Sequence, residues 1–142
     1  MPASLYGILS TMNILDNIVE WNRERGILDI PFDHLKETSF IIEELLESTG
    51  QFDSQSAREK AEQIASSIVK NGQAEEEKLI DAWADIIVFA TGAMAKLGYN
   101  PNEVMQEVCK EINSRTGKMV DGKFIKDKDI EPYVADFSNC KL

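Results

Sequence analysis

Apolar residues recur at intervals of three and four positions through most of the chain, the spacing that places them on one face of an α-helix. Glycine or proline interrupts the pattern at several points, and an Asp, Ser or Asn often precedes the next apolar run, as helix N-caps do. The pattern predicts five helices, over residues of about 4–25, 33–49, 54–71, 75–97 and 101–117.

The segment after residue 118 has a different pattern. Asp121 and Gly122 follow Val120 and precede Lys123 and Phe124, and an Asp-Gly pair between such residues is typical of a tight turn. No series of alternating strands is present elsewhere. The sequence therefore predicts a single all-α domain over residues 1–142, a bundle of about five helices with a short irregular or hairpin-like C-terminal tail.

Two of the predicted helices carry carboxylates on a face that also holds large apolar residues. On a helical projection of residues 33–49, Phe40 lies among acids, opposite the main apolar stripe. In residues 75–97 the acidic face continues into Val88, Phe89 and Gly92. A face exposed only to water rarely holds these residues, so we expect both acidic faces to be covered at least in part. The acids are Glu37, Glu44 and Glu47 in the first helix and Glu77, Asp81 and Asp85 in the second.

Carboxylates near one another in a covered region repel unless a positive charge lies between them. Mg²⁺ is a hard cation that takes oxygen ligands and keeps waters for a phosphate substrate, so it suits Glu44, Glu47 and Asp85, with Asp81 as a fourth candidate. His34 is the only histidine, which argues against an imidazole zinc site or a di-iron bundle. The alternative interpretation is that these acids form an ordinary solvated helix face.

Composition narrows the range of partners and compartments. The formal net charge of −10 disfavours binding to polymeric nucleic acid, because phosphate contacts need clustered Lys and Arg. Cys109 and Cys140 form neither a Cys-x-x-Cys pair nor a disulfide framework, so both are expected to be free thiols. The N-terminal residues do not resemble a signal peptide, and no apolar run reaches the length of a membrane span. We expect a cytoplasmic protein that does not bind membranes.

At the acidic segments, and over most of the chain from about Trp21 to Lys126, the sequence resembles the MazG-like branch of the all-α NTP pyrophosphohydrolase superfamily. The family pattern is Glu-Glu-x-x-Glu on one helix and Glu-x-x-Asp on a later one. The first stands here as Glu43-Glu44-Leu45-Leu46-Glu47, and a C-terminal segment similar to the family's runs from Glu111 to Lys126. The second pattern departs from the family: position 82 is Ala82, and the nearest acid is Asp81, which shares a face with Asp85.

The resemblance implies Mg²⁺-dependent cleavage of a nucleoside triphosphate between the α and β phosphates, with Mn²⁺ able to substitute. Glu44, Glu47, Asp81 and Asp85 would hold the metal, which would lower the pKa of an attacking water. Either Glu43 or Glu47 would accept its proton, and the sequence does not separate the two. The resemblance makes Arg115, Lys118 and Lys126 candidates for phosphate contacts, and Trp21, Asn22 and Arg25 candidates for base or sugar contacts, although Trp21 also fits ordinary packing.

The apolar residues on more than one helix face predict a homodimer or homotetramer, the assembly that the resemblance also implies, with part of each pocket supplied by a neighbouring subunit. Two other functions remain open. One is a related enzyme such as a phosphoribosyl-ATP pyrophosphatase, which the same acidic pattern would suit. The other is a non-catalytic helical adaptor. The preferred base and the biological role do not follow from the sequence.

Overall fold

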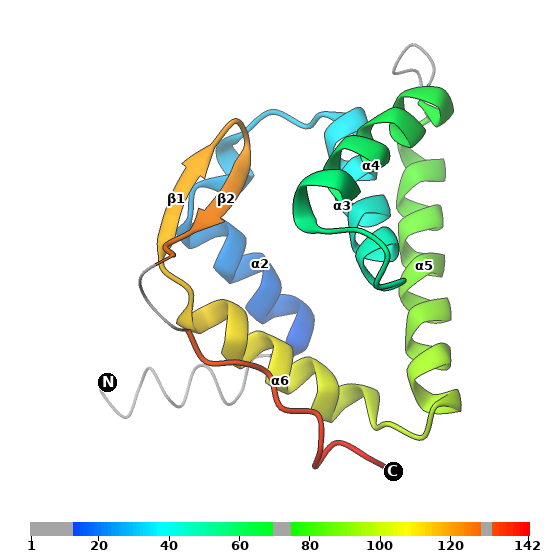
Figure 1. Cartoon of the computed structure of the whole chain (residues 1–142), viewed down its shortest axis with the longest axis vertical. Helices are drawn as coiled ribbons and strands as arrows, with labels where there is room; N and C mark the ends of the chain where they lie inside the picture. Colours follow the sequence, from blue (N-terminus) through cyan, green and yellow to red (C-terminus); the bar gives the residue numbers. More distant parts are fainter. Residues whose placement is uncertain (1–12, 70–74, 129–131) are drawn as a thin grey trace. The chain divides into compact units, whose positions relative to one another are not determined.

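The structure is a computed structural model, and it describes residues 13–69, 75–128 and 132–142. This part of the chain contains five α-helices, one 3₁₀ turn and one two-stranded antiparallel sheet (Figure 1). The predicted all-α fold with a hairpin tail is confirmed. The elements are α2 (Ile14–Glu24), η1 (Ile27–Asp29), α3 (His34–Glu47), α4 (Ser54–Ile68), α5 (Glu76–Lys96), α6 (Pro101–Ser114), β1 (Gly117–Val120) and β2 (Lys123–Lys126).

The chain divides into two compact units, which are described one at a time. The first unit comprises residues 1–30 and 86–142, and the second comprises residues 31–85. The boundary falls within α5, so that each unit holds about half of this helix. That residues 1–142 form a single domain stays a prediction from the sequence.

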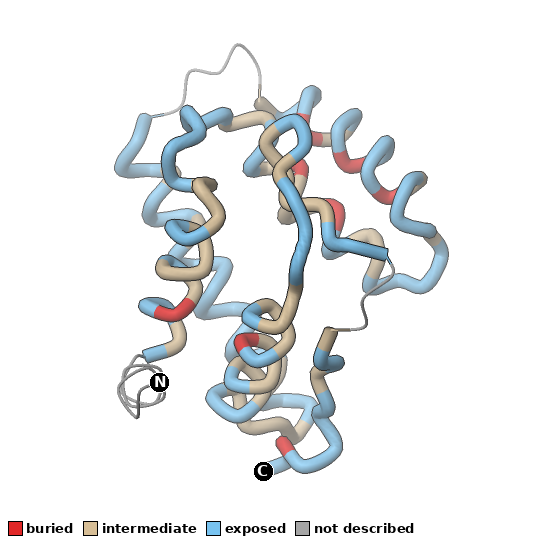
Figure 2. Tube along the Cα trace, turned by 90° about the vertical axis from the view of Figure 1, so that its left-hand side faces the viewer, coloured by how far each residue is buried: buried red, intermediate tan, exposed pale blue. Residues whose placement is uncertain are grey.

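In the unit of residues 31–85, α3 and α4 lie side by side (Figure 1). Asp53 begins α4 with a capping box, in which it accepts a hydrogen bond from the backbone of Ser56 and the Ser56 hydroxyl lies 3.1 Å from the Asp53 backbone nitrogen. Every fourth residue of α4 is then an alanine with no exposed surface: Ala57, Ala61 and Ala65. These small side chains let α3 approach closely. Buried positions along the trace are red in Figure 2. Ile68, three residues further along, is 63% exposed.

In the unit of residues 1–30 and 86–142, α2 packs along α6. The amides of Asn17 and Asn113 exchange two hydrogen bonds, of 3.3 Å and 3.1 Å, and Asn17 is buried. Asn13 is the N-cap of α2 and accepts a hydrogen bond from the backbone of Asp16. The predicted helix over residues 4–25 was therefore wrong at Asn13, because its backbone is extended and α2 begins only at Ile14. Residues 4–12 of that prediction lie outside the described residues.

The predicted hairpin is present as β1 and β2, with Gly117 opposite Lys126 and Val120 opposite Lys123. Asp121 and Gly122 form the turn with φ of 50° and 79°, the left-handed region that a two-residue hairpin turn uses. Gly117 is needed for a different reason, since a Cβ there would lie 2.2 Å from the carbonyl oxygen of Ile125.

Helix α5 leaves most of its apolar residues exposed. On the face that carries most of these residues, Leu79, Trp83 and Met94 are half-buried, but the rest are exposed. The exposed members are Ile80, Ile86, Ile87, Ala90 and Leu97. Their exposure explains why the buried apolar residues of the described chain are few and small, namely three alanines and two cysteines. No helix among the described residues is both long enough and apolar enough to cross a membrane.

Candidate functional site

The four predicted metal ligands lie on two helices. Glu44 and Glu47 are in the last turns of α3, and Asp81 and Asp85 are in the first half of α5. Glu47 is half-buried and the other three are exposed. Within residues 13–69, 75–128 and 132–142, no three His, Cys, Asp or Glu side chains come close enough together to hold a metal ion. As arranged in this single chain, the acids do not fit an assembled Mg²⁺ site, and their metal-binding role stays a prediction.

Glu43, one of the two candidates for the base, has a different environment from its neighbours. Its side chain is only 9% exposed, and the Nε atom of Arg58 in α4 donates a hydrogen bond to its Oε1 over 3.3 Å. The carboxylate therefore takes part in an ion pair between α3 and α4. Of the two candidate bases, Glu47 has the more accessible side chain.

Trp83 packs against an aromatic neighbour, although it is only half-buried. Its indole meets the edge of Phe32 with ring centroids 5.9 Å apart, and Phe32 also stacks on His34 at 6.3 Å. His34 is half-buried at the first position of α3. These three rings attach the beginning of α5 to the segment that precedes α3.

The predicted phosphate-binding cations lie at the end of α6 and on the hairpin. Arg115 is the C-cap of α6, and its guanidinium lies 3.6 Å from the carboxylate of Glu111. Lys118 is opposite Ile125, while Lys126 is opposite Gly117. Because successive residues of a strand point to opposite faces, Lys118 and Lys126 project from opposite faces of the hairpin. The structure thus does not bring these two lysines together, although both are exposed.

The candidates for base or sugar contacts already have intramolecular partners. The indole nitrogen of Trp21 donates to the carbonyl oxygen of Ile112 over 2.7 Å, and the Arg25 guanidinium lies 4.3 Å above the Trp21 ring. Arg25 also donates to the carbonyl oxygen of Arg115 over 3.1 Å. Burial lowers the pKa of Arg25, and the charge of Glu24 partly opposes this effect.

The remaining contacts complete this aromatic cluster. The edge of Trp21 meets Phe124 of β2 with centroids 5.3 Å apart, and Arg25 lies 5.3 Å from the same ring. The amide of Asn22 donates to the carbonyl oxygen of Ile18 one turn earlier, over 2.7 Å. These contacts fasten the hairpin to α2 and to the end of α6, which supports packing as the role of Trp21.

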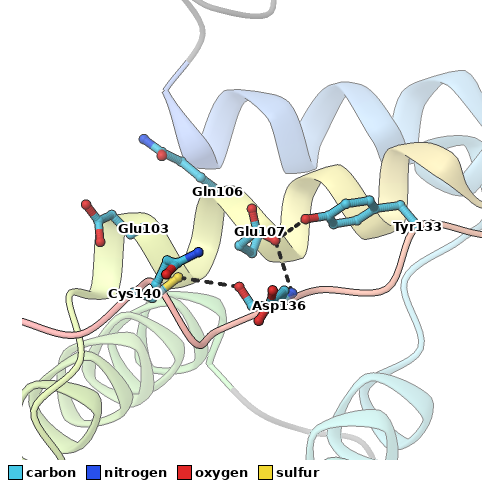
Figure 3. Close-up of a pocket in the computed structure, with 7 residues that line it drawn as sticks. Glu103, Gln106, Glu107, Tyr133, Asp136 and Cys140 are labelled. Carbon is cyan, nitrogen blue, oxygen red and sulfur yellow. Dashed lines mark hydrogen bonds between the residues drawn. The ribbon is translucent and has the colours of Figure 1, made fainter.

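A hollow of about 260 Å³ between α6 and the C-terminal tail was not predicted (Figure 3). Its central group is the carboxylate of Glu107, which accepts hydrogen bonds from the Tyr133 hydroxyl, from the Asp136 backbone at 3.0 Å and from Lys110 at 2.9 Å. These donors, the Tyr133 hydroxyl first, lower the pKa of Glu107 to about 2. The lining consists of Glu103, Gln106, Glu107, Tyr133, Asp136, Asn139 and Cys140.

This arrangement attaches the tail to α6. Burial raises the pKa of the Cys140 thiol in the lining. The tail also pairs with the turn before α6: the backbone of Asn100 donates to Cys140 over 2.6 Å, and Leu142 donates to Gly98 over 2.8 Å. No local sequence signal predicts these contacts, because they depend on how an irregular tail lies along a distant helix.

Comparison of the chain with protein-family models, with curated protein sequences and with solved structures gives no significant match. The resemblance of Glu43–Glu47, Asp81–Asp85 and the segment from Glu111 to Lys126 to the MazG-like branch therefore stays a prediction from the sequence.

Proposed function

We propose that this chain hydrolyses nucleoside triphosphates to a monophosphate and pyrophosphate in the presence of Mg²⁺. The observation that carries the proposal is the accessibility of the acids in residues 31–85. Glu44, Asp81 and Asp85 are exposed, and Glu47 is half-buried, so solvent reaches the side chains of all four. Carboxylate oxygens are the protein ligands that Mg²⁺ prefers.

The proposal requires these acids to come closer together than they are in the single chain. Separated carboxylates have no energetic reason to gather without a cation, because their charges repel. A cation with its phosphate ligand, or a second copy of the chain, would supply that reason. Since the assembled site is not described, we assign no order of catalytic steps to it.

Positively charged side chains would bind the phosphates of the substrate. The proposal assigns these contacts to Arg115 and to either Lys118 or Lys126 of the hairpin. Lys118 and Lys126 face opposite sides, so a single phosphate chain would contact only one of them. Replacing each lysine separately by alanine tests which of the two contacts the phosphates. The lysine that contacts the substrate should raise KM when removed, while removal of the other should leave KM unchanged.

The direct test is a panel of ribonucleoside and deoxyribonucleoside triphosphates incubated with the full chain and Mg²⁺, Mn²⁺ or a chelator. Products are separated by anion-exchange chromatography. We expect monophosphate and pyrophosphate with either metal and none with the chelator. Diphosphate and orthophosphate as the first products, or no hydrolysis of any nucleotide with either metal, would overturn the proposal.

Variants of α5 make this test specific to the proposed residues. Asp85→Asn should lower kcat/KM by on the order of a hundredfold or more, since it removes one charge from the cation-binding set. Glu77→Gln, on the same helix and also exposed, is the matched control and should retain wild-type kinetics. Equal kinetics of the two variants would remove Asp85 from the site.

A second candidate function is a non-catalytic binding module. It is favoured by the exposed apolar residues of α5, among them Val88 at 65% and Phe89 at 77% exposure. Such residues together are typical of a surface that another protein covers. The nucleotide panel separates the two functions, because a binding module would hydrolyse none of its members.

A further inference from the structure

One face of α5 has an exposed aromatic side chain near its middle, an acidic residue at one end and a basic residue at the other. Asp85, Phe89, Gly92 and Lys96 follow one another at spacings of four, three and four residues. At about 100° per residue these four positions fall within roughly 60° of arc, so they form a single stripe along the helix. All four are exposed, and Phe89 is 77% exposed. We call these four residues the α5 stripe.

Gly92 is the unexplained member of the α5 stripe. Glycine within a helix is unfavourable relative to alanine, so its presence usually has a packing reason. The described chain supplies none, since a Cβ placed on Gly92 would meet no atom within 4 Å. Its φ also lies outside the left-handed region, which leaves the backbone without a need for glycine. Among the described residues Gly92 thus has no packing reason, and the close approach of a second chain would supply one.

The α5 stripe is complementary to itself. When two copies of α5 cross antiparallel with the two-fold axis between positions 90 and 91, Phe89 of each helix lies opposite Gly92 of the other. Asp85 of each helix then lies opposite Lys96 of the other. The Phe89 ring of each copy fills the space above Gly92 of the other, and each Asp85 carboxylate faces a Lys96 ammonium group. The two-fold axis repeats both contacts. A face that matches its own copy under a two-fold rotation is the requirement for a closed dimer.

We propose that α5 is a homodimer interface in which two copies cross antiparallel at Phe89 and Gly92, with Asp85 paired to Lys96 of the second copy. The pairing covers Phe89, and it brings the acids of one α5 next to a second chain. The proposal names the surface and the register of the assembly, and it stands whether or not the chain hydrolyses nucleotides.

The register is tested by sedimentation velocity of the full chain over a dilution series at low ionic strength, without nucleotide. Asp85→Lys and Lys96→Asp should each weaken the dimer on the order of tenfold, because each places like charges opposite one another twice. The double variant Asp85→Lys with Lys96→Asp should restore wild-type association. A double variant that associates no better than the single ones would overturn the register.

The apolar contact is tested in the same series. Phe89→Gln should weaken the dimer on the order of thirtyfold, as expected for a large side chain at the centre of an interface. The matched control is Leu97→Gln, because Leu97 is 79% exposed but lies about 110° around the helix from the middle of the stripe. Equal effects of the two variants would overturn the proposal.

Gly92→Ala distinguishes a monomer with a free α5 from the proposed dimer, because the variant should favour the first and weaken the second. Alanine favours an isolated helix, so a monomer with a free α5 would become more stable. In the proposed dimer the added methyl group meets Phe89 of the second copy, and association should weaken. The full chain as a monomer at every concentration, or a Gly92→Ala variant that associates more strongly, would overturn the proposal. Because no readout involves hydrolysis, an inactive dimer would refute only the proposed function.

Discussion

The ion pair between Glu43 and Arg58 allows a packing role of Glu43 to be separated from a catalytic one. Replacing Arg58 with methionine keeps most of the side-chain length and removes the guanidinium that donates to the carboxylate over 3.3 Å. The nearly buried Glu43 is then left without this partner, and the attachment of α4 to α3 weakens. Glu43→Gln weakens the same contact from the other side.

The expected loss follows from the exposure of the two side chains. Breaking a fully buried ion pair costs about 3–5 kcal/mol, and breaking an exposed one about 0.2–1 kcal/mol. Glu43 is 9% exposed but Arg58 is 45% exposed, so solvent screens the pair in part. We expect each single variant to lower the free energy of unfolding by about 1–2 kcal/mol, which corresponds to a fall in Tm of roughly 2–8 °C.

The assay is chemical denaturation followed by circular dichroism, with all variants at one protein concentration because self-association shifts apparent stability. The two single variants and the double variant complete a cycle, and a coupling energy of about 1 kcal/mol is expected. Glu47→Gln, one turn further along α3, is the matched control and should stay within about 0.5 kcal/mol of the wild type. Additive effects of the single variants, or an unchanged stability of Glu43→Gln together with lost hydrolysis, would refute the packing role.

Four further predictions concern other contacts. Ala61→Leu should lower the free energy of unfolding by about 1–3 kcal/mol in denaturant titrations, because a larger side chain does not fit between α3 and α4. Trp21→Phe keeps an aromatic ring but removes the indole hydrogen bond to the carbonyl oxygen of Ile112, which then keeps only the backbone N–H of Arg115 as a donor, and this should cost about 0.5–1.5 kcal/mol in the same assay. Glu107→Ala should detach the tail and increase thiol labelling of Cys140, only 4% exposed in the wild type, on the order of tenfold. Because the pKa of Glu107 is lowered from 4.5 to about 2, the tail contact should be complete above pH 4.5 and weaken as the pH falls toward 2, measured by amide hydrogen exchange.

Each of these variants has a control in the chain. Ala84→Leu, on the exposed side of α5, should leave stability nearly unchanged, and equal losses at positions 61 and 84 would contradict close packing of α4. Unchanged stability of the Trp21 variant would return Trp21 to the set of base-binding candidates. Glu103→Gln should not increase labelling of Cys140. Labelling is measured in a Cys109→Ser background, so that Cys140 is the only thiol that reacts.

Local signals in the sequence were sufficient to predict most of the helices and the hairpin. Asp33, Asp53 and Asn100 cap the helices that follow them, and Asp121 with Gly122 makes the predicted turn. Each depends on a few neighbouring residues, whose backbone preferences act within one or two turns. Asn13 was missed because an apolar pattern continues across it, and the periodicity outweighed a single capping residue.

The arrangement of the candidate site was less predictable, because it depends on contacts between distant residues. Periodicity shows that Glu43, Glu44 and Glu47 lie on α3, but not that Arg58 reaches the first of them from α4. Likewise, Lys118 and Lys126 belong to one short segment, and only the strand register shows that they face opposite sides. A residue type and its position along the chain therefore give candidates, while the pairing of elements decides which of them share a surface.

The division of the chain into units also has a consequence for the order in which it folds during synthesis. Residues 31–85 are contiguous, so α3 and α4 can pair as soon as a ribosome has released them. In contrast, Asn17 bonds to Asn113, a partner 96 positions away, so α2 must remain without it while the whole intervening unit is translated. Contacts that close such long loops form slowly, and the apolar residues of α2 stay uncovered in the meantime. We therefore expect nascent chains arrested before α6 to contain a protease-resistant fragment of residues 31–69 and a protease-sensitive α2.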